Sequence, residues 1–180
     1  MHFKRFLDIK PEISNLFIIF INNKVLYDLN DKTFLLNSSF LNFTNFEFKK
    51  IGIAQDNNMN IYAADLSNES FSLSNQGYQS LVEYDLRYLM TILSEKDLEL
   101  VGRANQLLHY LNSSKYCGYC GSVMEFDSTE EAMFCKCNNL MIYPKISPCV
   151  LALIKKDNQI LLARNALFPE GLYSALAGFI

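Results

Sequence analysis

The feature that most constrains the fold of this chain is a set of four cysteines in two close pairs. Cys117 and Cys120 form the first pair, and Cys135 and Cys137 form the second. The insert between the pairs, residues 121–134, has 14 residues, which is long enough for a hairpin that returns to its starting point. Two thiol pairs joined by a hairpin are typical of a small metal-binding ribbon.

The compartment of the protein decides between a metal site and disulfides. The longest apolar run, residues 16–21, is far shorter than the roughly 20 residues that span a bilayer, and the N-terminus lacks the apolar core of a signal peptide. We therefore expect a soluble cytoplasmic protein without a membrane partner. Thiols stay reduced in the cytoplasm, so metal ligands or redox groups are favoured over disulfides.

Composition and charge limit the partners. Half of the 180 residues are apolar and 13% are aromatic, which is typical of a chain that buries a core. The net charge of -3 gives no overall attraction to phosphate backbones. Residues 115–145 carry three lysines against four acids, a poor charge distribution for contact with nucleic acid. We therefore expect no direct DNA binding.

The N-terminal part of the chain is predicted to form a sheet. Two apolar runs, residues 16–21 and 25–28, are joined by Asn22, Asn23 and Lys24, a polar connection of hairpin length. Further short apolar runs are separated by clusters of Asn, Ser and Asp, which indicates a mostly antiparallel sheet with polar loops.

Two helices are predicted between this sheet and the cysteines. Helical periodicity begins near Asp85 and continues to Asn112. Ser94 is a good N-cap for the second helix, with Asp97 three residues further on. The fold class predicted is therefore α+β. His109 lies in the second helix without metal-ligand spacing to the cysteines, and we interpret it as incidental.

The two cysteine pairs differ in how well they fit one ion. Gly121 permits the tight turn that lets both sulfurs of the first pair face a metal. In the second pair only Lys136 intervenes, and side chains two residues apart in an extended chain lie about 6.6 Å apart, whereas a tetrahedral zinc site needs sulfurs roughly 3.8 Å apart. A local kink would close this gap.

Other ligand sets and other chemistries stay open at this point. Cys149 would be a substitute for one thiol, although it begins an apolar run and is expected to pack in a core as a small hydrophobe. A redox dithiol and a metal-free hairpin are further alternatives. We favour zinc, with these ligands: Cys117, Cys120, Cys135 and Cys137.

An ordered series of residues carries a family resemblance. It comprises KYCGYCG, an insert with Thr129, Glu130, Ala132 and Met133, the second cysteine pair, Tyr143-Pro144, Pro148-Cys149, ILLAR and LAGF. The series closely resembles the NADH pyrophosphatases, also called NAD diphosphatases, which are a zinc-ribbon branch of the Nudix hydrolases. The resemblance covers residues 98–180, and no single short motif carries it.

The resemblance implies a domain organisation and an activity. Residues 1–93 would form an N-terminal domain of NADH pyrophosphatase type, 94–115 a connecting helix, 116–148 the zinc ribbon and 149–180 the start of a Nudix domain. Such enzymes hydrolyse the pyrophosphate of NADH or NAD to nicotinamide mononucleotide and AMP with Mg or Mn, and some remove NAD caps from RNA. Zinc held by four thiolates has no open position, so it would be structural.

The catalytic glutamates of this family lie in the Nudix box, which begins with the glycine of LAGF. The sequence given reaches Gly178 and ends at Ile180. The acids of residues 149–180 are Asp157, in a predicted hairpin turn, and Glu170, in a loop. Hydrolysis of a pyrophosphate needs carboxylate-bound cations and a base. We therefore expect this polypeptide by itself to be inactive.

The resemblance also implies binding roles for individual residues. Ala177 matches a residue whose backbone carbonyl coordinates Mg or Mn, and Phe179 matches an aromatic that stacks on a nucleotide ring. Glu130 and Tyr143 match substrate contacts across a dimer interface, which implies a homodimer. Arg87 matches a substrate-contacting arginine. Each also has a purely structural interpretation, as a solvated charge or a packing aromatic.

The alternative is a non-catalytic function. The segments 149–156 and 160–165 would have unpaired edges and apolar faces, which favour association. On this interpretation the chain is a non-catalytic zinc-ribbon module for dimerisation or protein binding.

Overall fold

The computed structural model describes residues 2–3, 14–37, 50–56, 59–67, 80–127 and 129–180. The chain divides into two compact units, Met1–Pro144 and Lys145–Ile180. Across the described ranges, the helices are too short or too polar to cross a membrane. The predicted class, α+β, is confirmed by a mixed sheet and two helices in the first unit.

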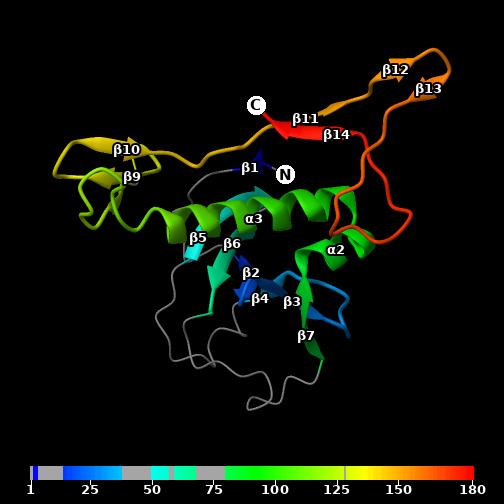
Figure 1. Ribbon diagram of the computed structural model, residues 1–180. Coiled ribbons are helices and arrows are strands. Elements are labelled where there is room, and N and C mark those ends of the chain that lie inside the picture. The colour runs from blue at the N-terminus through cyan, green and yellow to red at the C-terminus, as the bar shows by residue number, and fades with distance from the viewer. Residues whose placement is uncertain (1, 4–13, 38–49, 57–58, 68–79, 128) are drawn as a thin grey trace. The chain divides into compact units, whose positions relative to one another are not determined.

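The main sheet of the first unit has the strand order β1-β5-β6-β2-β3-β7, with β4 also paired to β2 (Figure 1). The predicted N-terminal hairpin is confirmed as β2 and β3, which are joined at Asn22 and Asn23. Both asparagines have positive φ (50° and 63°), which Asn tolerates better than most residues and which tight hairpins require. The strands are β1 His2–Phe3, β2 Ser14–Ile21, β3 Lys24–Asp28, β4 Leu36–Asn37, β5 Lys50–Asp56, β6 Met59–Asp65 and β7 Leu81–Asp85.

The prediction of a mostly antiparallel sheet is confirmed, and one described strand pair of this sheet is parallel. Strands β2 and β6 are parallel, with Leu16 opposite Ile61 and Ile18 opposite Ala63. The other strand pairs of the sheet are antiparallel. The sheet is therefore mixed, and its central strand is buried on both faces. Ile18 and Phe20 belong to the apolar cluster that includes the helix residues, whereas Phe17 and Ile19 belong to a second cluster.

Helices α2 Leu86–Ile92 and α3 Glu95–Ser113 follow the sheet. The predicted cap of α3 is confirmed, since the Ser94 hydroxyl oxygen accepts a hydrogen bond from the Asp97 backbone amide at 3.3 Å. The helix packs across β5 and β6 (Figure 1). Its buried face is Leu100, Val101, Ala104, Leu107, Leu108 and Tyr110.

The cysteine region forms a small three-stranded antiparallel sheet in the order β10-β9-β8. The predicted out-and-back hairpin is strand β8 Glu125–Asp127 followed by β9 Ala132–Cys135, and β10 Leu140–Ile142 completes the sheet. The buried residues beneath it are Tyr110, Cys117, Met124, Met133 and Cys135. This core is small, so the ribbon depends on further ties.

The second unit contains two strand pairs. Strand β11 Cys149–Ala152 pairs with β14 Leu176–Phe179, and β12 Lys155–Lys156 pairs with β13 Gln159–Ile160. The predicted turn at Asp157 is confirmed, with φ of 53°. The expectation that Cys149 packs in a core is wrong: its side chain is exposed, because β11 and β14 are exposed along their whole length within the described residues.

Truncating a core residue of α3 tests this packing. Leu107 is fully buried against the sheet, so Leu107→Ala should lower the free energy of unfolding by roughly 2–5 kcal/mol through lost burial and a cavity. Met90, which is 63% exposed on α2, provides the control, and Met90→Ala should change it by less than about 0.5 kcal/mol. Urea unfolding followed by far-UV circular dichroism measures both. Equal effects would contradict the packing described.

Candidate functional site

Three of the four predicted metal ligands lie together. The sulfurs of Cys117, Cys120 and Cys135 are all within 4.8 Å of one another, and those of Cys120 and Cys135 are 3.5 Å apart. Thiolates bound to one tetrahedral zinc ion are separated by roughly 3.8 Å. Cys117 and Cys135 are buried and Cys120 is exposed, so the group opens to solvent on one side. The donor set therefore fits a thiophilic cation such as zinc.

The backbone around the first pair is shaped to present both sulfurs. The Gly121 amide donates to the Cys117 carbonyl at 2.8 Å, and Gly121 has φ of 74°, a conformation that glycine adopts at low cost. The backbone amides of Cys120 and Tyr119 hydrogen-bond the Cys117 sulfur and lower its pKa to about 6. Deprotonation is what a metal ligand requires, so this turn favours the ligating form.

The other two thiols of the group respond to different surroundings. Hydrogen bonds with Ser122 lower the pKa of the Cys120 thiol. The bond with the Ser122 hydroxyl has the largest effect, and the bond with its backbone amide has the next largest. Burial raises the pKa of the Cys135 thiol, because a thiolate is costly in an apolar setting without a cation beside it. A bound cation would remove that cost, which agrees with a metal at this point.

The fourth predicted ligand, Cys137, does not join this group. Its side chain is exposed, and its sulfur lies 3.1 Å from the Ser122 hydroxyl oxygen, which in turn lies 3.4 Å from the Cys120 sulfur. Its role as a ligand stays a prediction. Cys149, the substitute considered from the sequence, lies in the second unit and is exposed.

A buried tyrosine ties the ribbon to α3. The Met133 amide donates to the Tyr110 hydroxyl oxygen at 2.7 Å, and the Tyr110 hydroxyl donates to the Ile142 carbonyl at 2.5 Å. Burial raises the pKa of Tyr110, an effect that the Met133 amide partly opposes. Sequence reasoning missed this residue; its one signal is a tyrosine on the apolar face of a helix that leads to the cysteines.

Two predicted substrate contacts lie side by side on the ribbon. The Tyr143 hydroxyl donates to a Glu130 carboxylate oxygen at 3.2 Å, and both side chains are exposed. Glu130 is held in the β8–β9 turn, where the Asp127 carboxylate accepts from the amides of Thr129 and Glu130 at 2.8 and 3.0 Å. The pair therefore presents an acceptor and a hydroxyl to solvent at one place.

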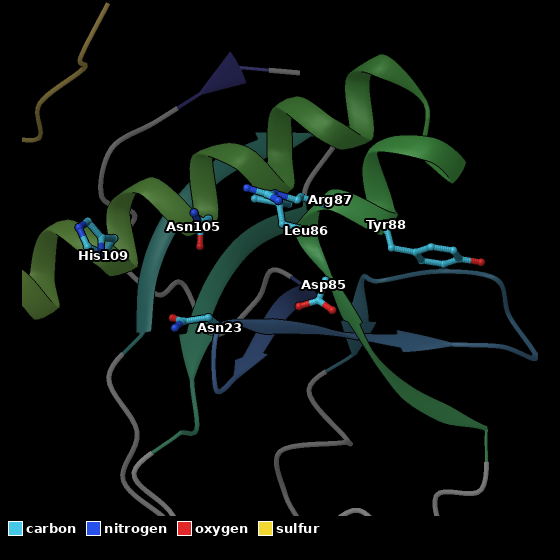
Figure 2. Close-up of a pocket in the computed structure, with 7 residues that line it drawn as sticks. All are labelled: Asn23, Asp85, Leu86, Arg87, Tyr88, Asn105 and His109. Carbon is cyan, nitrogen blue, oxygen red and sulfur yellow. The ribbon is translucent and has the colours of Figure 1, made fainter. Parts of the chain in front are cut away.

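Arg87 lines a hollow in the first unit, at the start of α2 (Figure 2). The hollow has a volume of about 780 Å³ and lies between the β2–β3 turn, the β7–α2 junction and α3. His109, which the sequence analysis treated as incidental, also lines it. The full lining is Asn23, Asp85, Leu86, Arg87, Tyr88, Asn105 and His109.

Ala177 and Phe179 lie on β14 in the second unit. The side chain of Phe179 is 81% exposed. The Ile180 amide donates to the Pro148 carbonyl at 3.2 Å. Ile180 and Pro148 are therefore a hydrogen-bonded pair of the antiparallel ladder between β11 and β14. Because such pairs alternate in an antiparallel ladder, Ala177 and Leu151 form a non-hydrogen-bonded pair. The Ala177 carbonyl therefore points away from β11.

Comparison with known proteins gives a consistent partial match. Curated proteins named NAD-capped RNA hydrolase NudC are 43% identical to this chain over 82 residues; they include those of Escherichia coli O1:K1, Escherichia coli K12 / DH10B and Shigella boydii serotype 18. The match covers 46% of this chain and 32% of each relative, so the chain spans about a third of their length. No family model matches the chain. The resemblance inferred from the residues is confirmed by these relatives.

Removing the Tyr110 hydroxyl tests the tie between α3 and the ribbon. Tyr110→Phe leaves the buried Met133 amide without its partner, which should lower the free energy of unfolding by about 1–3 kcal/mol. Tyr116, which is 65% exposed, supplies the matched control, and Tyr116→Phe should have almost no effect. Thermal unfolding of the metal-loaded protein measures both, and indistinguishable midpoints would show that the tie contributes nothing.

Proposed function

We propose that this chain contributes the zinc ribbon and part of the substrate pocket of a cytoplasmic Nudix hydrolase. That enzyme would hydrolyse the pyrophosphate of NADH or NAD to nicotinamide mononucleotide and AMP, with NAD-capped RNA as a further substrate. The observation that carries the proposal is the 43% identity to proteins named NAD-capped RNA hydrolase. The zinc would be structural, because a metal enclosed by protein ligands has no position for water.

The paired Glu130 and Tyr143 side chains suit an uncharged part of the substrate. A carboxylate repels a phosphate but accepts hydrogen bonds from hydroxyl groups, and a phenol both donates and accepts. The 3.2 Å hydrogen bond between them holds both groups ready for a ribose. These two residues would therefore recognise a sugar of the dinucleotide.

The remaining predicted contacts suit the charged and aromatic parts of the substrate. The Arg87 guanidinium matches the geometry of a phosphate, and Phe179 offers an exposed ring for stacking on a base. The Ala177 carbonyl points away from β11, and Mg or Mn prefers oxygen ligands of this kind. When bound, Mg or Mn would neutralise charge on the pyrophosphate.

A chimera tests the proposed activity. The 180-residue polypeptide by itself should not hydrolyse NADH, because the acids of its second unit are Asp157 in a turn and Glu170 in a loop. When residues 98–180 replace the stretch of Escherichia coli NudC that they resemble, the chimera should release reduced nicotinamide mononucleotide and AMP from NADH with Mg. Glu130→Gln in the chimera should lower kcat/KM roughly 10- to 100-fold, the equivalent of about 1.5–3 kcal/mol for a hydrogen bond to a charged group.

The matched control for that chimera is Glu125→Gln. Glu125 is a ribbon acid paired with Lys136 at 2.6 Å on the surface, where an ion pair contributes little. Its substitution should leave kcat/KM unchanged. A folded, zinc-loaded chimera without activity would refute the proposed function. Equal losses for Glu125→Gln and Glu130→Gln would remove Glu130 from the substrate site.

A second candidate function is association without chemistry, as a homodimer or with another protein. The second unit favours it, because large apolar side chains are exposed there, including Leu151 at 72%, Leu153 at 61% and Phe179 at 81%. Large exposed apolar side chains on one small unit favour association. A homodimer is compatible with both candidate functions.

Light scattering during gel filtration tests association. The chain should elute as a dimer at low and at high salt, because apolar contacts are not screened, and added RNA should not change its mass. Leu151→Lys should shift the equilibrium toward the monomer. Lys155→Glu, on the neighbouring strand β12, is the control for charge alone and should not. A monomer at all concentrations would rule out this interface.

A further inference from the structure

The two turns that carry the metal-binding cysteines have the same local geometry. In the first turn the sulfur of Cys117 accepts hydrogen bonds from the backbone amides two and three residues later, those of Tyr119 and Cys120. In the second turn the sulfur of Cys135 accepts from the amides two and three residues later, those of Cys137 and Asn138. The second turn therefore repeats the first.

This equivalence assigns matching positions in the two turns. Asn138 occupies the position of Cys120, the second ligand of the first turn. Cys137 occupies the position of Tyr119, whose side chain is 85% exposed. Cys137 is likewise exposed. A side chain at the position of Tyr119 or Cys137 therefore points away from the proposed metal position between the two turns.

The side chain of Asn138 lies where a fourth ligand is needed. Its amide nitrogen is 3.6 Å from the sulfur of Cys117, and its amide oxygen is buried without a hydrogen-bond partner. Two donors on one tetrahedral zinc ion, an oxygen at about 2.0 Å and a sulfur at about 2.3 Å, are roughly 3.5 Å apart. Buried amide oxygens are nearly always satisfied, so this oxygen calls for an explanation.

The sulfur of Cys137 is engaged elsewhere. It lies 3.1 Å from the hydroxyl oxygen of Ser122, and that hydroxyl stands between it and Cys120. It does not lie within the 4.8 Å that contains the sulfurs of the other three cysteines.

We propose that the metal is held by the thiolates of Cys117, Cys120 and Cys135 and by the amide oxygen of Asn138, while Cys137 stays a free surface thiol. The inference rests on the proposed metal site. A half-turn of the Asn138 amide exchanges its oxygen and nitrogen and brings the oxygen to the side of Cys117. Oxygen is an accepted zinc ligand, and a neutral amide leaves the centre with one negative charge fewer than four thiolates would.

Such a centre differs from a four-cysteine site in two ways. A neutral amide oxygen binds zinc more weakly than a thiolate, so the metal should leave more readily to a chelator. The free thiol of Cys137 should also react with alkylating and oxidising reagents while the metal is bound, because it is exposed and not consumed as a ligand.

Alkylation of the zinc-loaded full chain, read by mass spectrometry, gives the first test. Iodoacetamide should modify Cys137 at a rate close to that of Cys149, an exposed thiol of the second unit that serves as internal reference. Cys117, Cys120 and Cys135 should be protected until the metal is removed. Protection of Cys137 together with the other three would overturn the proposal.

Cobalt substitution of matched variants gives the second test. Sulfur-to-cobalt absorption reports the number of bound thiolates, so Cys137→Ser should leave it unchanged and Asn138→Cys should raise it by about a third, from three thiolates to four. In zinc competition with a chelator, Asn138→Ala should weaken binding at least tenfold, while Cys137→Ser should stay within twofold.

Asn138→Asp separates a ligand from a hydrogen-bond donor. A carboxylate oxygen also binds zinc, so Asn138→Asp should retain the metal. If Asn138 only donates its amide hydrogen to the Cys117 thiolate, Asn138→Asp should weaken zinc binding as much as Asn138→Ala, and the proposal fails. A chain that binds no zinc or cobalt would refute the metal site as a whole, and the hydrolase proposal would still be decided by the chimera.

Discussion

The ribbon depends on the hydroxyl of Tyr110. That single group accepts a hydrogen bond from β9 and donates one to the end of β10, and its ring is buried in a cluster with Met124, Met133, Cys117 and Cys135. A sheet of three strands this short buries little apolar surface by itself, so packing against a helix adds to its stability. The tyrosine fixes two of its strands to a helix that is itself packed on the main sheet, and a metal would fix the turns at the other end.

The same two constraints position the proposed substrate contacts. Tyr143 follows β10, one residue beyond the carbonyl of Ile142 that Tyr110 holds. Glu130 lies in the turn before β9, whose last residue is the proposed metal ligand Cys135. The hydrogen bond between Tyr143 and Glu130 therefore joins two segments that are each anchored close by. A structural metal would act on substrate binding through this arrangement, without touching the substrate.

Local signals in the sequence predicted local structure well. The polar connection from Asn22 to Lys24 predicted a hairpin by its length, and the structure gives both asparagines the positive φ that they tolerate. Ser94 predicted a helix start because its hydroxyl satisfies a free backbone amide. The parallel pairing of β2 with β6 was not predictable in this way, because it joins strands about 40 residues apart. A pairing over this separation has no turn motif or other local sequence pattern that would indicate it. Cysteine spacing predicted a metal centre, but the proposed role of Asn138 depends on hydrogen bonds in the two turns that the spacing does not indicate.

Charge decides which part of a dinucleotide the ribbon would meet. Its acids include Glu125, Asp127 and Glu130, and its one central lysine, Lys136, is already paired with Glu125 at 2.6 Å. Among the described residues of the second unit, Arg164 donates to the carbonyls of Phe168 and Pro169. A pyrophosphate would then be bound by divalent cations, by the guanidinium of Arg87 or by exposed lysines such as Lys155 and Lys156 of β12. The ribbon is left with the hydroxyl-bearing, uncharged part of the ligand, which is the part that a carboxylate and a phenol can bind.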